Sequence, residues 1–315
     1  MQFKKEKLSL SLTAQAVFFS RADYFCKLYE RMIILESLLD IFQKTKDVLC
    51  KYDYYIYTPK RVLHLTNSEL KIPHLMGMQY IGRPNQFTGD NGVYSIKKKR
   101  ITHDSIEKLV KKYYKKEEKQ RTIIEMIYRK LNNLYLLEEM FHSYSKLYLY
   151  EKTENLDTEF DCDYLMVHES GKAILHLGLV KSADNKGLYH CNSFMTTYQT
   201  DREKDLFFCN LSTRYEINKI VRENKQSKKK EVVYLSEQAE LREKSGIMKM
   251  LSDAGIEADE TLLKYIMRLN VKFGEYHTID MLSDSEQLIN KCRDKRDEAL
   301  VKDFIELWRK WSDGI

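Results

Sequence analysis

The chain has 315 residues, of which 43% are hydrophobic and 32% are charged, with 11 Gly and 3 Pro. This composition is that of a folded protein and excludes global disorder, while the length allows one large domain or two smaller ones. The formal net charge of +6 is a mild basic bias, which by itself does not identify a nucleic-acid-binding protein.

Cysteine usage and the apolar runs indicate where the chain resides. The six cysteines lack the Cys-x-x-Cys spacing of a zinc or redox motif, so we interpret them as thiols in a reducing compartment. The first 12 residues have no continuous apolar stretch, and no window approaches the roughly 20 apolar residues of a membrane span. We therefore expect a cytoplasmic protein without membrane contact.

The first half of the chain is expected to be mostly helical, with one hairpin. Apolar residues recur at three- and four-residue spacings from residue 13 to about residue 50, which predicts one long helix or a helical pair. Two β-prone runs, 54–58 and 62–66, are separated by Pro59 and are typical of a hairpin. A second helical pair is predicted, with one helix capped by Thr102 or Asp104 and another from about residue 120 to residue 141.

The second helical pair carries a basic stretch. Between residues 97 and 130 there are 13 Lys and Arg against 5 Asp and Glu, and a second basic run lies at residues 225–230. A solvated helix face and a charged loop explain these runs as well as nucleic-acid binding does. If the chain binds nucleic acid, we expect phosphate contacts from Lys97, Lys98, Lys99, Arg100, Lys111, Lys112, Lys115, Lys116, Lys119 and Arg121.

Four strands are predicted in the middle of the chain, at residues 164–168, 173–180, 188–195 and 205–211. Short polar connections favour an antiparallel meander. Beyond residue 231 the pattern is helical again. We expect an α+β fold in which a small antiparallel sheet of about four strands, plus the N-terminal hairpin, packs with helices and is followed by a helical C-terminal region. The lysine run divides the expected domains, residues 1–224 and 231–315.

Several chemistries are unsupported by any motif. The sequence has no Gly-rich phosphate loop, no His-Glu-x-x-His, no Gly-x-Ser-x-Gly and no dinucleotide fingerprint, so we expect neither a cofactor nor a metal. What remains is a set of proton-transfer side chains. RNA cleavage by its own 2′-hydroxyl needs only a base, an acid and a cation, roles that histidine and lysine suit near neutral pH. The histidines considered are His64, His74, His168, His176 and His190.

Three of these histidines are candidates, each with a simpler structural interpretation. Strand alternation places His176 on the face opposite Leu175, with Gly178 leaving space beside it. His190 follows on the next predicted strand, where polar residues are commonly the solvated side of a sheet. His74 is by default a core histidine bonded to the backbone.

The order of these segments resembles that of a known family. The residues that carry the resemblance are Leu63-His64-Leu65-Thr66, Ile72-Pro73-His74-Leu75-Met76-Gly77, Asp163-Tyr164-Leu165-Met166-Val167, Ile174-Leu175-His176-Leu177-Gly178-Leu179 and Asn192-Ser193-Phe194-Met195. They are similar to the fourth phage-type class of barnase, EndoU, colicin and RelE-like nucleases, which occurs in mobile elements and polyvalent phage proteins. The similarity covers about residues 50–220.

The resemblance implies helices packed on a four-stranded antiparallel sheet and an RNase activity that requires no metal. By position, His74 matches the Pro-His-Leu-x-Gly element and Ser193 the Ser-Phe element. His176 is added from strand geometry alone. Because related nucleases vary their catalytic residues, the fold analogy alone does not assign any one side chain.

Two functions follow from the sequence. The first is an RNA endonuclease of a mobile genetic element, with His74, His176, His190, Ser193 and Lys181 as catalytic residues. The second is a non-catalytic module that binds nucleic acid or protein, for example an inhibitor of a host nucleoprotein complex. RNA is the expected partner, with a host or immunity protein as a further one. The sequence leaves open whether the chain is an enzyme, and it does not reveal the oligomeric state.

Overall fold

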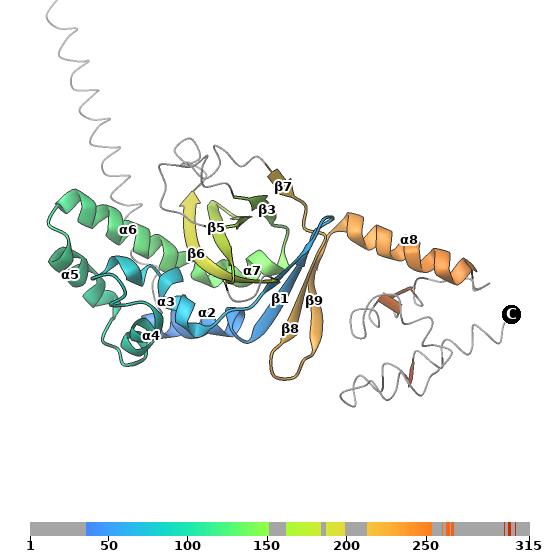
Figure 1. The fold of residues 1–315 in the computed structure, drawn as a ribbon, viewed down its shortest axis with the longest axis horizontal. Helices are drawn as coiled ribbons and strands as arrows, with labels where there is room; N and C mark the ends of the chain where they lie inside the picture. Colours follow the sequence, from blue (N-terminus) through green and yellow to red (C-terminus); the bar gives the residue numbers. More distant parts are fainter. Residues whose placement is uncertain are drawn as a thin grey trace, which may run out of the picture.

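The fold is built around one large mixed β-sheet. A computed structural model describes residues 36–150, 162–183, 187–198 and 213–253, with a few positions between 260 and 306. In the described residues nine strands pair in the order β7-β3-β4-β5-β6-β2-β1-β8-β9 (Figure 1). The strands are β1 (Tyr52–Tyr57), β2 (Val62–Leu65), β3 (Lys146–Leu149), β4 (Tyr164–Ser170), β5 (Ala173–Lys181), β6 (Leu188–Tyr198), β7 (Thr213–Tyr215), β8 (Lys219–Asn224) and β9 (Lys230–Leu235).

Helices lie against one part of the sheet, and one helix leaves it. Figure 1 shows α2 to α7 gathered beside β1 and β6, whereas α8 extends away from the β8–β9 edge. Capping boxes at Ser37 and Thr102 fix the starts of α2 and α5, the second as the sequence predicted. The helices are α2 (Leu38–Leu49), η1 (Glu69–Lys71), α3 (Ile72–Leu75), η2 (Met78–Tyr80), α4 (Gly89–Lys97), α5 (His103–Tyr113), α6 (Glu117–Asn133), η3 (Leu134–Leu136), α7 (Leu137–His142) and α8 (Glu237–Asp253).

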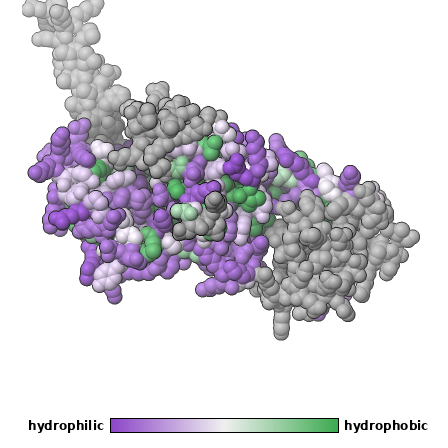
Figure 2. All heavy atoms as spheres, viewed as in Figure 1, coloured by the Kyte–Doolittle hydropathy of each residue, from purple (hydrophilic) through white to green (hydrophobic). Residues whose placement is uncertain are grey.

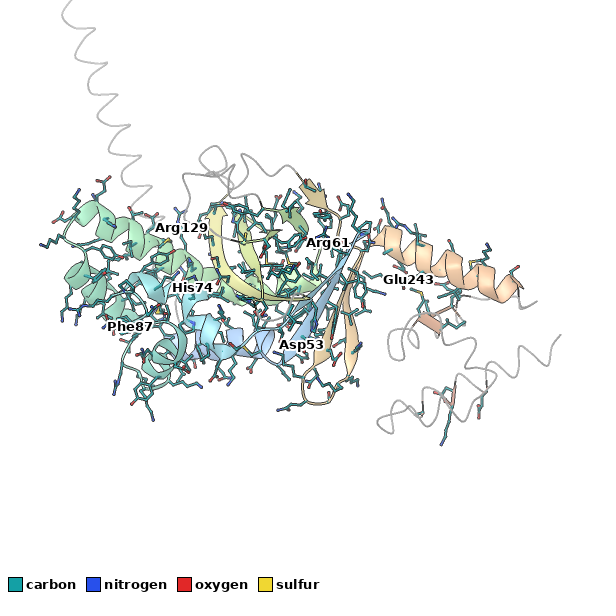
Figure 3. The ribbon with its side chains drawn as sticks, viewed as in Figure 1. Asp53, Arg61, His74, Phe87, Arg129 and Glu243 are labelled. Atoms are coloured by element: carbon teal, nitrogen blue, oxygen red, sulfur yellow. The ribbon has the colours of Figure 1, made fainter. Side chains whose placement is uncertain are left out.

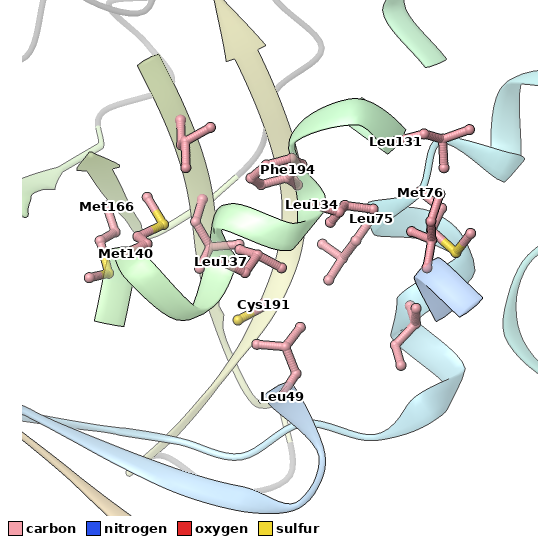
Figure 4. Packing of buried hydrophobic residues seen from close by; sticks show 14 of the residues in the cluster. Leu49, Leu75, Met76, Leu131, Leu134, Leu137, Met140, Met166, Cys191 and Phe194 are labelled. Carbon is pink, nitrogen blue, oxygen red and sulfur yellow. The ribbon is translucent and has the colours of Figure 1, made fainter. Parts of the chain in front are cut away.

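Alternate residues of the strands form the main core against these helices. Phe194 of β6 is fully buried, and Figure 4 shows it close to Leu134 and Leu137 on one side and to Leu75 of α3. A smaller buried cluster, which includes Leu165, occupies the opposite face of β4 and β5. The two faces of the sheet therefore differ, because strand residues point to them in turn.

The expectation of a small antiparallel sheet of about four strands was wrong. The hairpin β1–β2 joins the sheet, because β2 pairs in parallel with β6 through His64 and Leu188. Residues 146–149 and 213–235 supply four more strands. Three predicted strands do correspond to β4, β5 and β6, while the fourth, 205–211, lies outside the described residues.

The C-terminal prediction is corrected in part and untested in part. Strand β9 (Lys230–Leu235) belongs to the same sheet, so residues 231–235, which were expected to begin the helical region, form a strand, and the lysine run lies in the turn between β8 and β9 and at the start of β9. Helix α8 follows, and most of the chain beyond it lies outside the described residues. The division into domains 1–224 and 231–315 stays a prediction. Among the described helices none is both long and apolar enough to cross a membrane.

One lysine of the basic stretch lies in the core. Lys130 of α6 is 3% exposed, and its Nζ lies 5.4 Å from the centre of the Tyr80 ring. Burial lowers the pKa of Lys130 to about 8. Because burial disfavours the charged form, this ammonium destabilises the folded state at neutral pH.

Replacing Lys130 is expected to stabilise the protein. In the wild type the free energy of unfolding rises with pH between about 8 and 10.5, because the unfolded chain holds the proton more tightly there. Lys130→Met removes this dependence and raises the free energy of unfolding at pH 7 by about 3 kcal/mol. Urea unfolding at pH 7 and pH 9.5 measures both effects.

The control is Lys119→Met, an exposed residue of the same helix, which should change stability by less than about 0.5 kcal/mol. A Lys130→Met protein that is no more stable than the wild type at pH 7 would contradict this reading of the buried ammonium.

Candidate active site

A row of polar side chains lies on the sheet face opposite the main core. In β2, Leu65 is buried in the core, so His64 projects from the other face. The pairing of Tyr55 with His64 puts Asp53 and Tyr55 on this face too. On β6, His190 precedes the buried Cys191 and therefore points the same way. We call this the polar face.

The two histidines of the polar face lie on neighbouring strands. The parallel register places Leu188 beside His64, and His190 follows two residues along β6. With strands about 4.8 Å apart and a rise of about 3.3 Å per residue, the Cα atoms of His64 and His190 are separated by roughly 8 Å. One phosphodiester group fits between side chains at this spacing.

His64 is held by β1 on two sides. Its ring stacks on Tyr55 with centroids 4.4 Å apart, and its Nε2 lies 4.0 Å from Asp53 Oδ2. The side chain is 31% exposed. Burial lowers the pKa of His64, and the Asp53 carboxylate partly offsets this by favouring the protonated ring. Because Nε2 is turned toward Asp53, Nδ1 is the nitrogen left for a substrate.

His190 has a different electrostatic environment. Burial and the nearby Lys71 both lower its pKa, against a smaller opposing effect of Asp163. Lys71 of η1 also lowers the pKa of His74, so its ammonium lies within electrostatic reach of both rings. Burial, reinforced by the neighbouring cation, therefore favours the neutral form of His190.

Further cations border the polar face where the β8–β9 turn begins. Lys225 Nζ lies 3.4 Å from Asp53 Oδ1 and donates a hydrogen bond of 2.8 Å to the carbonyl oxygen of Asn67. Lys228 and Lys230 each place Nζ 3.6 Å from a carboxylate oxygen of Glu223. These contacts place Lys225 beside Asp53, the carboxylate that faces His64.

The residues that the sequence predicted as catalytic are only partly brought together. His176, His190 and Ser193 do share the polar face. His176, however, is 0% exposed, and it lies four residues along β5 from the partner of His190, which separates the two by roughly 14 Å. A fully buried ring does not reach a substrate in this conformation.

The other two predicted residues lie elsewhere. His74 is on α3, on the helix side of β6, as Figure 3 shows from its place beside the helices. Burial, Lys130 and Lys71 lower the pKa of His74 to about 4. Lys181 ends β5 on the core face, and its N–H donates to Asp163 Oδ2 at 2.7 Å.

Sequence reasoning gave His64 no specific role and overlooked Asp53 and Lys225. The signal was present in the hairpin, because alternation within residues 52–57 and 62–65 puts Asp53, Tyr55 and His64 on one face once the turn is placed. Lys225 was noticed only as part of a charge run. Its contact with Asp53 depends on the pairing of β1 with β8, which no local pattern reveals.

The predicted phosphate-contacting residues are all exposed. Figure 2 shows hydrophilic residues over the part of the molecule that contains α4 and α5. Lys97 at the end of α4 pairs with Glu69 of η1 at 3.0 Å, two residues from Lys71. The basic end of α4 therefore adjoins η1, whose Lys71 contributes to the lowered pKa of His190. The predicted phosphate contacts that the structure places at the surface are Lys97, Lys98, Lys99, Arg100, Lys111, Lys112, Lys115, Lys116, Lys119 and Arg121.

Ser145, His168 and Glu139 are arranged like a catalytic triad, but their hydrogen bonds indicate a structural role. His168 Nδ1 lies 3.2 Å from Ser145 Oγ, and its Nε2 lies 3.4 Å from Glu139. The Ser145 hydroxyl donates its one hydrogen to the Met140 carbonyl, and Nδ1 is also 3.0 Å from the carbonyl of Tyr144. Because Ser145 is buried and its proton is used, this cluster fastens β4 to the α7–β3 connection.

Two imidazoles and a lysine on one sheet face form the kind of site that nucleases use on phosphodiesters. The comparisons with known proteins agree with this class. A family model described as phage-Barnase-EndoU-ColicinE5/D-RelE like nuclease4 matches residues 37–239, more than half of the chain. The chain belongs to this phage-related nuclease family, which confirms the resemblance found in the sequence. No match was found among curated proteins or solved structures.

The neighbours of His64 are expected to set its pKa in opposite directions. Asp53→Asn should lower the pKa of His64 further, because the carboxylate favours the protonated ring, and Lys225→Met should raise it, because the ammonium opposes protonation. An NMR titration of the histidine ring signals measures both shifts. His103, on α5, is the internal control whose pKa should not change. If the pKa of His64 stays unchanged in both variants, Asp53 and Lys225 do not lie close enough to the ring to influence it.

Proposed function

We propose that the chain is a ribonuclease of a mobile genetic element, an endonuclease in which His190 and His64 transfer protons during attack of the RNA 2′-hydroxyl. The observation that carries the proposal is the placement of these two rings on one face, at a spacing suited to one phosphate, beside Lys225 and Lys71. Membership of a nuclease family supports it.

The environments of the rings assign their roles. Burial and Lys71 both disfavour protonated His190, so neutral His190 suits the base that removes the 2′-hydroxyl proton. Burial also lowers the pKa of His64, but the Asp53 carboxylate opposes this, so His64 is the better suited of the two rings to act as the acid. The 2′-oxygen then bonds to phosphorus, the bond from phosphorus to the 5′-oxygen breaks, and that oxygen takes the proton of His64. The products carry a 2′,3′-cyclic phosphate and a free 5′-hydroxyl.

Lysines stabilise the negative charge that develops on the phosphoryl oxygens during this step. Lys225 is placed for this by its contacts with Asp53 and Asn67. The exposed lysines at the end of α4 lie beside η1 and are proposed to hold phosphates of flanking nucleotides. Ser193, on the same face and strand as His190, is proposed as a further substrate contact.

The proposal does not require the remaining residues predicted from the sequence. The helix-side His74, the buried His176 and the core-face Lys181 have no step in this proposal. A catalytic role for each of them stays a prediction.

Removing either proton-transfer group is expected to impair cleavage strongly. His64→Ala and His190→Ala should each lower kcat/KM for RNA cleavage by about 100-fold or more, because general acid and base catalysis each contribute on that scale. The assay is run with EDTA present, and the ends of the products are mapped. His103→Ala, which removes a ring bonded to the Glu36 carbonyl, is the matched control with near wild-type activity.

Two outcomes would contradict this assignment. One is cleavage by His64→Ala and His190→Ala at the wild-type rate. The other is cleavage of a substrate with 2′-deoxyribose at the scissile position, which lacks the nucleophile. Intact RNA bound at a fixed ratio to the wild-type protein would instead favour the non-catalytic binding module.

The pH dependence of cleavage is expected to peak below pH 6.5. The rate requires neutral His190 and protonated His64, and in the free protein both rings have a pKa below the ordinary value of 6.5. The kcat/KM profile reports the free protein, so its maximum lies between the two lowered values. Asp53→Asn should move the maximum to still lower pH. A maximum above pH 7.5 would contradict the assigned pair.

A further inference from the structure

We infer that Asn67 is a positioning residue, which fixes His190 and Lys225 relative to His64. The inference rests on the proposed function, since it concerns the same site. Asn67 lies just after β2 and is 7% exposed. Its side-chain Oδ1 accepts a hydrogen bond of 2.7 Å from the Cys191 N–H, and its backbone oxygen accepts one of 2.8 Å from Lys225 Nζ.

The side-chain oxygen of Asn67 takes the place of a backbone acceptor at the point where the pairing of β2 with β6 ends. The Thr66 N–H donates to the Tyr189 carbonyl at 2.9 Å, which continues the ladder one residue beyond β2. The next N–H of β6 on this side belongs to buried Cys191, and the Asn67 side chain accepts it. Because His190 lies between Tyr189 and Cys191, the backbone is held on both sides of it.

This part of β6 needs such a contact, because its pairing with β5 is irregular. The register shifts so that Gly178 pairs with Ser193 while Leu179 pairs with Cys191, which leaves Asn192 as an extra residue. A bulge bends a strand and redirects its side chains. The Asn67 contact therefore fixes the strand immediately before the bulge.

The orientation of the Asn67 amide follows from its partner. Because the Cys191 N–H is a donor, the acceptor atom Oδ1 must face it, and Nδ2 points elsewhere. Nδ2 is buried, and the Asn67 side chain also interacts with the Cys191 thiol, whose pKa it lowers against the larger, opposite effect of burial. The amide is therefore held against Cys191, the residue that follows His190.

Through these two bonds one residue joins the three elements of the site. Asn67 follows the strand of His64, accepts from the strand of His190, and accepts from the turn that carries Lys225. Loss of its side-chain acceptor is expected to change the separation of base and acid without removing either group. Since transition-state geometry is more demanding than binding, the loss should appear in kcat more than in KM.

The test compares Asn67→Leu with Asn133→Leu. Asn133 on α6 is also 7% exposed, and its Nδ2 donates one hydrogen bond of 2.8 Å to the Arg129 carbonyl, so it matches Asn67 in burial and bond number. Asn67→Leu should lower kcat at least tenfold with KM changed less than threefold. It should also speed hydrogen exchange of the Cys191 amide at least tenfold and shift the NMR titration of His190. Asn133→Leu should do none of these.

A third variant separates the acceptor from general packing. Asn67→Asp keeps an Oδ acceptor and should restore slow exchange at the Cys191 amide. The inference is overturned if Asn67→Leu and Asn133→Leu give the same changes, or if the Cys191 amide remains protected in Asn67→Leu. Amide exchange and the His190 titration do not depend on activity. They therefore test the role of Asn67 even if the wild type does not cleave RNA. Absence of cleavage would contradict only the proposed function.

Discussion

The parallel pairing of β2 with β6 is the constraint on which the rest of the structure depends. It joins two antiparallel units, β7-β3-β4-β5-β6 and β2-β1-β8-β9, into one sheet. The direct pairing is short, from His64 with Leu188 to Leu65 with Tyr189, and the Thr66 N–H extends it by one hydrogen bond. Because this junction sets the register between the units, it also sets which residues of the two units face each other. The polar face is a consequence of that register.

Local patterns in the sequence predicted strands well but not their assembly. Alternation and turn residues are local, and they located the hairpin and strands β4, β5 and β6. Strands β8 and β9 were missed because consecutive charged residues, such as Arg222 and Glu223 of β8, interrupt the apolar pattern next to a lysine run that is typical of a solvated loop. The pairing of residue 64 with residue 188 leaves no local signal, so the sequence did not reveal that the hairpin joins the sheet through β6.

The candidate site shows the same division between local and long-range information. Alternation placed His176 on the face opposite Leu175, whereas His190 and Ser193 come to that face only through the pairing of β5 with β6 and its register shift at Asn192. It did not predict that His176 is fully buried, since burial depends on what packs above a strand. His64 had been considered without a partner, because Asp53 becomes its neighbour only through the hairpin register and Lys225 only through β8. In this protein the residue types pointed to the chemistry, and the register selected which of them share a site.

The central claim is that His64 and His190 act on one phosphate. The most direct measurement is an NMR titration of both rings with and without a dinucleotide whose 2′-deoxyribose prevents cleavage. A phosphate held between the rings favours their protonated forms, so the pKa of both His64 and His190 should rise by about one unit on binding, while that of His103 stays constant. If the dinucleotide binds and only one of the two rings responds, or neither does, the claim is contradicted.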